Sequence, residues 1–154
     1  AREAARSALE DVRRIAQQLR PEVLDDLGLP SALASLGGQI RRAAQVRVEC
    51  NIERDLPDLG RDAELVVYRV AQESLTNIAR HARAGSVELR LERSPGGVAL
   101  TVRDDGVGVD GDAVRLTGGI QGMRERAMLV DAELSVVQAD AGGTLVRLEM
   151  PVEP

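Results

Sequence analysis

Two pairs of strand-like stretches constrain the fold of this chain more than any other feature of its sequence. Residues 86–93 and 97–104 alternate apolar and polar side chains and are joined by the turn sequence SPGG. Residues 133–139 and 144–150 form a second pair around the turn sequence DAGG. Alternation with a period of two predicts strands with one buried face, and the glycine turns predict hairpins. A sheet with one apolar face must be covered by a second layer.

Predicted helices supply that second layer. Residues 2–19, 30–44, 61–82 and 119–130 are predicted to be helical, and residues 46–52 alternate like a further strand. This order of elements predicts an α/β fold, a two-layer sandwich with a mixed, mostly antiparallel sheet, preceded by an N-terminal helix. The first helix fits an edge helix of the domain and a fragment of a coiled-coil or bundle helix equally well.

The composition excludes several classes of function. The chain has arginines but no lysine, so neither a Walker A phosphate loop nor Schiff-base chemistry can operate. A single His and a single Cys exclude the usual zinc sites, and no Gly-x-Ser-x-Gly motif accompanies His81. A net charge of -5 and only one aromatic residue, Tyr68, argue against direct binding of nucleic acid. The core must therefore be built from aliphatic side chains.

Cysteine content and hydropathy indicate the compartment. Cys50 is alone and cannot form an intrachain disulfide, which fits a reducing, cytoplasmic location. No apolar run approaches the roughly 20 residues of a membrane span. Because the chain begins inside a helical pattern without a Met, we expect it to be part of a longer protein, whose membrane attachment stays open.

Two groups of polar residues carry potential chemistry. Glu73 and Asn77 are four residues apart on a predicted helix, so they share a face, and an ordinary solvated helix face would show the same pattern. A carboxylate can move a proton, and an amide oxygen suits Mg²⁺. Asp104 ends a predicted strand before Gly106 and Gly108. It could accept a hydrogen bond from an exocyclic amine while the glycines admit a flat ring, although a plain Asp-Gly turn explains the pattern equally well.

A third group lies at the start of the predicted 119–130 helix. Gly118, Gly119 and Gly122 leave backbone amides accessible there, and the helix dipole adds positive charge. Such a site favours phosphate, although a flexible loop and helix cap would look the same. With a net charge of -5, the chain would need Mg²⁺, local amides and arginines such as Arg124 or Arg126 to hold a polyphosphate.

In this order and at these separations, the three groups resemble the motifs of sensor histidine kinases. Residues 72–82, QESLTNIARHA, resemble the N-box. Residues 104–108, DDGVG, look like the first glycine box, and residues 119–126, GIQGMRER, are similar to the second. Gly143 and Thr144 match the Gly-Thr pair near the end of the domain. Each motif alone is weak, but the ordered set is specific.

A subfamily is suggested by the sequence before these motifs. Leu19-Arg20-Pro21, Leu27-Gly28-Leu29 and the Arg80-His81-Ala82 ending are similar to the nitrate-sensor-like sensor kinases, between dimerisation and catalytic domains. This resemblance implies that residues 1–27 are the end of the second dimerisation helix with its linker. Residues 28–154 would be the catalytic ATP-binding domain.

The resemblance implies a Bergerat-type ATP-binding fold, also called GHKL, shared with gyrase, Hsp90 and MutL. Mg²⁺ and ATP would be its cofactors. Carried over by position, Glu73 would be the polar or basic group beside the transferred phosphoryl group, and Asn77 would ligate Mg²⁺. The nucleotide-binding residues would be Asp104 at the adenine amino group, Gly106 and Gly108 at the base, Thr144 through its hydroxyl group, and Gly119, Gly122, Met123 and Arg124 in the second glycine box.

Some features depart from the family pattern. The family's phosphoacceptor His lies on a helix that this chain does not contain, and His81 belongs to the N-box. Residues 109–117 are short for a nucleotide lid, and residues 130–132, VDA, stand where the subfamily often has Leu-Gly-Gly. The implied partners are the phosphoacceptor domain, a response regulator and a second copy. The alternatives are an anti-sigma-factor Ser/Thr kinase of the same fold and a docking pseudokinase without nucleotide.

Overall fold

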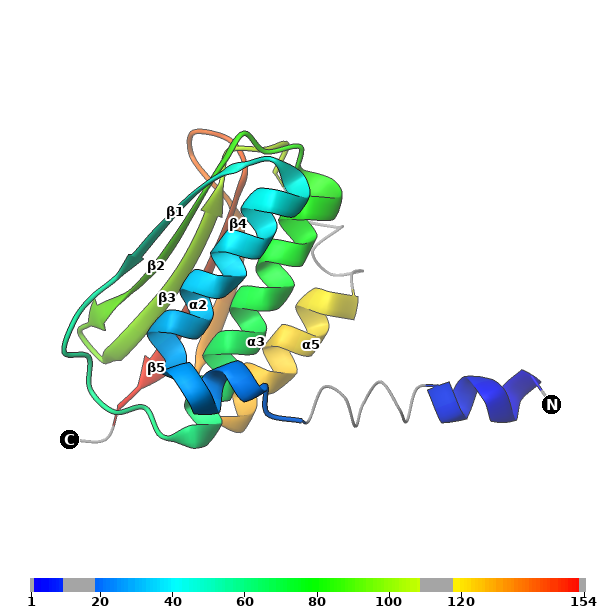
Figure 1. Cartoon of the computed structure of the whole chain (residues 1–154), viewed down its shortest axis with the longest axis horizontal. Helices are drawn as coiled ribbons and strands as arrows, with labels where there is room; N and C mark the ends of the chain where they lie inside the picture. The colour runs from blue at the N-terminus through cyan, green and yellow to red at the C-terminus, as the bar shows by residue number, and fades with distance from the viewer. Residues whose placement is uncertain (1, 10–18, 109–117, 153–154) are drawn as a thin grey trace.

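The computed structural model describes residues 2–9, 19–108 and 118–152. In it, one five-stranded sheet is covered on one face by the helices α2, α3 and α5 (Figure 1). The elements after residue 19 are α2 Glu22–Ala44, β1 Arg47–Ile52, α3 Arg61–Asn77, the π-helical η1 Ile78–Ala82, β2 Ser86–Ser94, β3 Gly97–Asp104, α5 Gly118–Leu129, β4 Glu133–Gln138 and β5 Thr144–Pro151. The predicted α/β sandwich and its hairpins are confirmed.

The sheet has the strand order β1-β2-β3-β5-β4. Strands β1 and β2 are parallel neighbours, with α3 and η1 in the connection between them, and the other pairs are antiparallel. A parallel pair needs such a crossover, whereas hairpins need only a turn. The register aligns apolar residues in one row across all five strands, namely Ile52, Leu91, Leu100, Leu148 and Leu134.

The core lies between the inner face of the sheet and the helices. Leu33 of α2 and Val67 of α3 are fully buried, as are Leu89 and Leu100 of the sheet. Tyr68, the only aromatic residue, is 6% exposed. The expectation of an aliphatic core is therefore confirmed, and it follows from the composition because no Phe or Trp is available.

The second helix was predicted to begin at Pro30, and in the structure α2 has a kink at Gly28, just before that point, with a further helical stretch from Glu22 that was not predicted. The helix begins at Glu22, and only Gly28, with φ 80 and ψ 170, interrupts it. Glycine adopts such a non-helical conformation without steric strain, and Pro30, two residues later, disfavours a continuous helix at this point. Leu24 and Leu29, on either side of the break, are 2% and 6% exposed, so burial continues through the kink. Leu24 thus lies in the first turn of α2, whereas Leu29 follows the kink.

The N-terminal residues 2–9 form a helix, as predicted. All eight side chains are exposed, and the segment stands away from the sandwich (Figure 1). The rest of the predicted 2–19 helix, residues 10–18, lies outside the described residues. Within the described part, no helix is both long and apolar enough to cross a bilayer.

The face of the sheet that the helices leave open carries charged side chains that pair along their own strands. Arg90 Nη2 lies 3.1 Å from Glu88 Oε2, and Arg147 Nη2 lies 2.7 Å from Glu149 Oε1. Exposed pairs of this kind contribute about 0–1 kcal/mol each. They make this face a polar surface rather than a source of stability.

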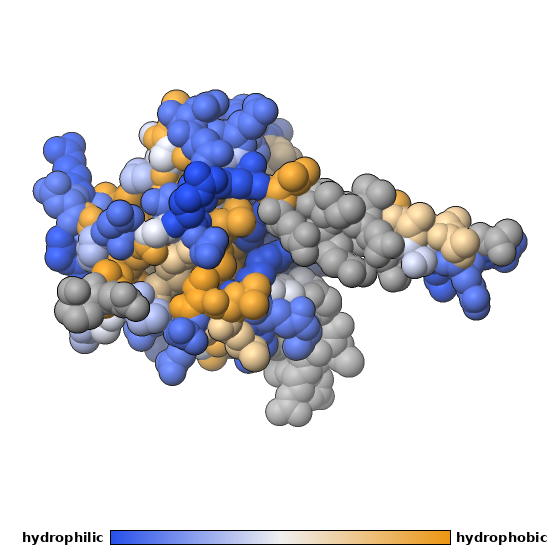
Figure 2. All heavy atoms as spheres, turned by 90° about the horizontal axis from the view of Figure 1, so that it is seen from below, coloured by the Kyte–Doolittle hydropathy of each residue, from blue (hydrophilic) through white to orange (hydrophobic). Residues whose placement is uncertain are grey.

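The two ends of the sandwich differ in character. Figure 2 views the end at which α2 and α3 begin and α5 finishes, and apolar side chains gather in its middle among charged ones. Met128 and Leu129 at the end of α5 are 73% and 83% exposed. The opposite end is where α3 finishes, α5 begins and β3 delivers Asp104 (Figure 1). The predicted site residues gather at that opposite end.

Candidate nucleotide-binding site

Asp104 is the buried carboxylate at this end of the sheet. It is the last residue of β3 and is 3% exposed. One of its oxygens, Oδ1, accepts a hydrogen bond from the Gly106 amide at 2.8 Å. Burial raises the pKa of Asp104, and the amides of Gly106 and Thr144 oppose this rise by donating to the carboxylate. A carboxylate has about four acceptor positions, so capacity remains for a further donor.

Glycines bring the main chain close to Asp104. A Cβ on Gly143 would lie 1.9 Å from the Asp104 carbonyl oxygen, and its φ of +85 is unfavourable for other residues. Gly108 has φ +81, and a Cβ there would lie 3.1 Å from the Gly143 carbonyl oxygen. The start of β5 and the glycine-containing segment after β3 are therefore packed backbone to backbone around the carboxylate. Only glycine permits this approach.

The neighbouring carboxylate, Asp105, has a structural role at the start of β2. Its Oδ1 accepts hydrogen bonds from the amides of Gly85 at 2.8 Å and Ser86 at 2.9 Å, and its Oδ2 accepts from the Ser86 hydroxyl at 2.9 Å. The Ser86 donors are the main reason that the pKa of Asp105 is lowered. Asp105 therefore holds the start of β2. Strand alternation separates the two carboxylates of the DDGVG motif.

Glu73 and Gly119 meet where α3 packs against α5. A Cβ on Gly119 would lie 2.2 Å from Glu73 Oε1, so the glycine leaves the space that the carboxylate occupies. Asn77 is the last residue of α3, half-buried, directly before η1. π-helical turns are common at functional sites. The structure thus joins Glu73 to the second glycine box and places Asn77 at the same end of the domain.

The remaining predicted residues differ in exposure. Met123 is fully buried and accepts a contact from the Ser74 hydroxyl at 3.7 Å, so it lies inside the seam between α3 and α5. Gly122 is half-buried, and a Cβ there would lie 3.9 Å from Arg126 Nη1. Arg124 is exposed on α5. Met123 therefore packs between α5 and α3, whereas Arg124 is accessible to a ligand.

The residues present fit a purine nucleotide. A buried carboxylate with acceptor capacity suits an amino group, and the glycine backbone at Gly106 and Gly108 leaves room for a flat ring. The first residues of α5 offer amides for phosphate. The stretch 109–117, predicted to be a short lid, lies outside the described residues.

Magnesium also fits, provided that phosphates complete its coordination. Among the described residues, no three His, Cys, Asp or Glu side chains come together as a metal cluster. Mg²⁺ is commonly bound by one or two protein oxygens together with water and substrate phosphates. The amide oxygen of Asn77, at the end of α3, is the protein ligand that this arrangement offers.

The sequence did not point to two features of this region. The role of Asp105 could have been read from strand alternation, because consecutive residues face opposite sides of a sheet. The contact between Ser74 and Met123 joins residues 49 positions apart, and no local pattern marks it.

The sequence matches a known family of ATPases. Residues 62–154 match the model of the histidine kinase-, DNA gyrase B-, and HSP90-like ATPases. The oxygen sensor histidine kinase NreB of Staphylococcus carnosus is 36% identical over 146 residues, which cover 94% of this chain and 42% of NreB. The sensor histidine kinase MctS of Rhizobium johnstonii is 33% identical over 150 residues, covering 95% of this chain and 32% of MctS. The chain thus spans less than half the length of these relatives.

Solved structures with a similar fold agree. The histidine kinase domain of the blue-light activated histidine kinase from Erythrobacter litoralis EL346 superposes with a TM-score of 0.66 at 26% identity, covering 80% of this chain and 60% of that one. The ATP binding domain of PrrB from Mycobacterium tuberculosis has a TM-score of 0.68 at 19% identity, covering 80% of this chain and 93% of that one. The second likeness shows the fold alone. The comparisons agree on an ATP-binding catalytic domain of the sensor histidine kinase kind.

Proposed function

Because the chain belongs to the histidine kinase-, DNA gyrase B- and HSP90-like ATPase family, we propose that it binds Mg²⁺-ATP as the catalytic part of a sensor histidine kinase. The observation that carries this proposal is Asp104, 3% exposed and surrounded by glycine backbone at the end of β3. A carboxylate costs free energy to bury, so a fold that keeps one here needs a donor to complete it. The adenine amino group is that donor.

The base would lie against the first glycine box. Asp104 accepts the hydrogen bond of the amino group, and Gly106 and Gly108 allow the ring to approach the main chain. Thr144 already donates its amide to Asp104, and its hydroxyl would assist at the same end of the sheet. Losing any of these should weaken binding of the base rather than the chemistry.

The phosphates would lie between the ends of α3 and α5. Mg²⁺ supplies charge neutralisation to the phosphates when it is bound, and Asn77 would ligate it. Gly119 lies in the first turn of α5, whose amides are free for phosphate, Gly122 follows in the next turn, and Arg124 adds positive charge. Glu73, which fills the space beside Gly119, orients or accepts a proton next to the transferred phosphoryl group. Phosphoryl transfer of this kind depends on positioning and charge neutralisation.

The phosphoryl acceptor would be a His outside this chain. The chain has one His, His81, which is exposed in η1 within the N-box-like motif, and we do not assign it the acceptor role. The acceptor would lie on a dimerisation helix of the whole protein, and a response regulator would receive the phosphoryl group. In that protein, residues 1–27 would be the end of the dimerisation region with its linker, and residues 28–154 the catalytic domain.

The assignment to a subfamily rests on the sequence before the nucleotide motifs, in residues 19–29. Leu19-Arg20-Pro21 and Leu27-Gly28-Leu29 support the nitrate-sensor-like subfamily and argue against an anti-sigma-factor kinase. A cytoplasmic location fits an ATP-dependent domain with a single cysteine. The kinase would act as a homodimer.

Calorimetry of the chain with ATP tests the proposal. We expect binding that requires Mg²⁺, and we expect Asn77→Ala to weaken Mg²⁺-ATP binding without weakening adenosine binding, because Asn77 acts only through the metal. If the chain binds neither ATP nor adenosine at millimolar concentration, the proposal is wrong and a docking module without nucleotide becomes the better explanation.

A further inference from the structure

We propose that Arg20 and Arg69 clamp the segment before α2 onto α3, and that this clamp sets how the catalytic domain is oriented for phosphoryl transfer. The inference rests on the proposed kinase function. It adds a positioning role for two arginines that belong to none of the nucleotide motifs. It also identifies the contact surface between the linker segment and the domain.

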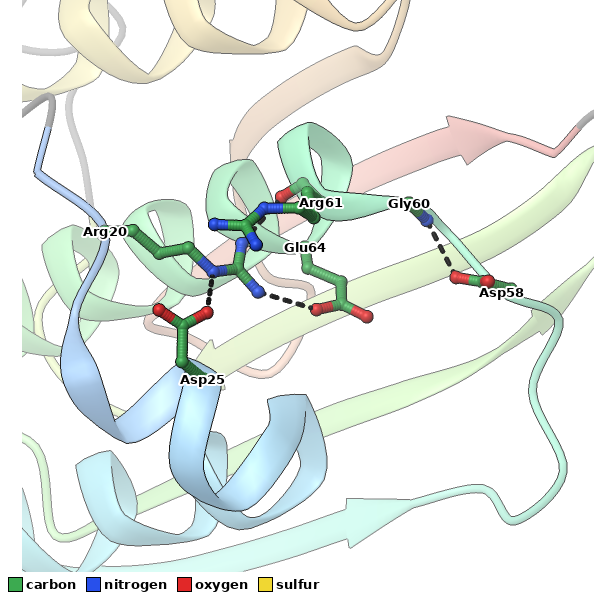
Figure 3. A network of polar contacts seen from close by, with 6 residues as sticks. All are labelled: Arg20, Asp25, Asp58, Gly60, Arg61 and Glu64. Atoms are coloured by element: carbon green, nitrogen blue, oxygen red, sulfur yellow. Dashed lines mark hydrogen bonds and ion pairs between the residues drawn. The ribbon is translucent and has the colours of Figure 1, made fainter.

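The Arg20 guanidinium group donates to three acceptors in two helices, α2 and α3 (Figure 3). Its Nε donates to Asp25 in the first turn of α2, its Nη1 donates to the Arg61 carbonyl oxygen at 2.9 Å, and its Nη2 donates to Glu64 Oε2 at 3.1 Å. The Arg20 side chain is only 15% exposed. The hydrogen bond that Arg20 donates to Asp25 is the main reason that the pKa of Arg20 is raised. A planar fork with several fixed donors is suited to such a three-way contact.

Arg69 holds the residue just before Arg20. Its Nη2 donates to the Leu19 carbonyl oxygen at 2.8 Å, and its Nη1 donates to Gln72 Oε1 at 2.8 Å. Residues four apart on a helix share a face, so Arg69 lies one turn from Glu73 along α3. The linker backbone is thus bound to the same helix face that carries the proposed catalytic carboxylate.

Burial completes the attachment. Leu24, in the first turn of α2, is 2% exposed and packs in the main core. The segment from Leu19 to Leu24 is therefore held by two arginines at one end and by the core at the other. Leu19 and Arg20 are thus bound directly to α3, and a force applied at Leu19 would reach α3 through these contacts.

The consequence concerns the rate of transfer. Phosphoryl transfer to a residue on another domain requires defined placement of both reactants, and small displacements are costly. Arg20 contacts Arg61 and Glu64 at the start of α3, whereas the proposed nucleotide site lies at the end where α3 finishes at Asn77. Breaking the clamp should therefore lower the transfer rate while leaving the affinity for ATP unchanged.

The first experiment measures hydrogen exchange of backbone amides on this chain. Arg20→Gln should speed exchange in residues 22–29 by about tenfold or more, the factor for losing one charged hydrogen bond. Arg90→Gln is the matched control, because Arg90 also faces two carboxylates, those of Glu88 and Glu92, but lies on the open sheet face. Glu64→Gln removes one arm of the clamp and should give a smaller effect in the same amides. Unchanged exchange in both clamp variants would overturn the inference.

The second experiment measures autophosphorylation in the whole kinase. Arg20→Gln should lower kcat by about tenfold or more without a change in KM for ATP, and Arg20→Lys should follow it because lysine keeps the charge but not the fork. Arg90→Gln should change neither. The inference is wrong if Arg20→Gln behaves like the control, or if KM changes in parallel with kcat. Absence of any ATP binding by the wild-type chain would instead refute the kinase function, and the exchange experiment would still test the clamp.

Discussion

Replacing Asp104 with Asn should separate nucleotide binding from folding. The amide keeps one oxygen for the Gly106 amide, which now donates at 2.8 Å, but its nitrogen cannot accept a hydrogen bond. A hydrogen bond to a charged group is worth about 1.5–3 kcal/mol, which corresponds to a rise in Kd for ATP of about 10- to 150-fold. Because burial already raises the pKa of Asp104, removal of the charge should not destabilise the fold.

The assay is calorimetric titration with ATP and Mg²⁺, combined with chemical denaturation of each variant. The matched control is Asp105→Asn, the same substitution one residue later. The Asp105 carboxylate accepts hydrogen bonds from the amides of Gly85 and Ser86. Removing its charge should therefore lower the free energy of unfolding and leave the affinity for ATP unchanged.

The reasoning would be refuted by either of two results. If Asp104→Asn binds ATP as tightly as the wild type, Asp104 does not receive the adenine amino group. If Asp105→Asn weakens binding as much as Asp104→Asn, the effect comes from general disturbance of the segment after β3. Only a difference between the two neighbours supports the assignment.

Three further predictions concern the same region. Gly143→Ala should cost at least about 3 kcal/mol of unfolding free energy in chemical denaturation, because φ is +85 and the Cβ would lie 1.9 Å from the Asp104 carbonyl oxygen. Gly119→Ala should leave Tm nearly unchanged but slow autophosphorylation of the whole kinase about tenfold or more, because the new Cβ displaces Glu73. Asp105 has a lowered pKa, so its stabilisation is complete above its unfolded value of about 3.9 and is lost as pH falls through the folded value. The difference in unfolding free energy between wild type and Asp105→Asn should therefore shrink in denaturation curves below about pH 4.

Local sequence patterns predicted most of the fold. The β2–β3 hairpin matches its predicted range within one residue, because alternation and turn chemistry depend only on neighbouring residues. The beginning of α2 at Glu22 was not predicted, because it depends on tertiary packing and not on neighbouring residues. Gly28 and Pro30 signal a break correctly, but burial of Leu24 in the core keeps the preceding turn helical.

The sequence by itself determined which residues are candidates for the nucleotide site and in what order they occur. Only the tertiary structure decided which of them meet. Glu73 approaches Gly119 because α3 packs on α5, and Arg20 reaches Glu64, 44 residues away, because the linker lies across the start of α3. Such contacts depend on sheet order and on packing between remote segments. Short-range periodicity carries no information about either, so the clamp could be found only in three dimensions.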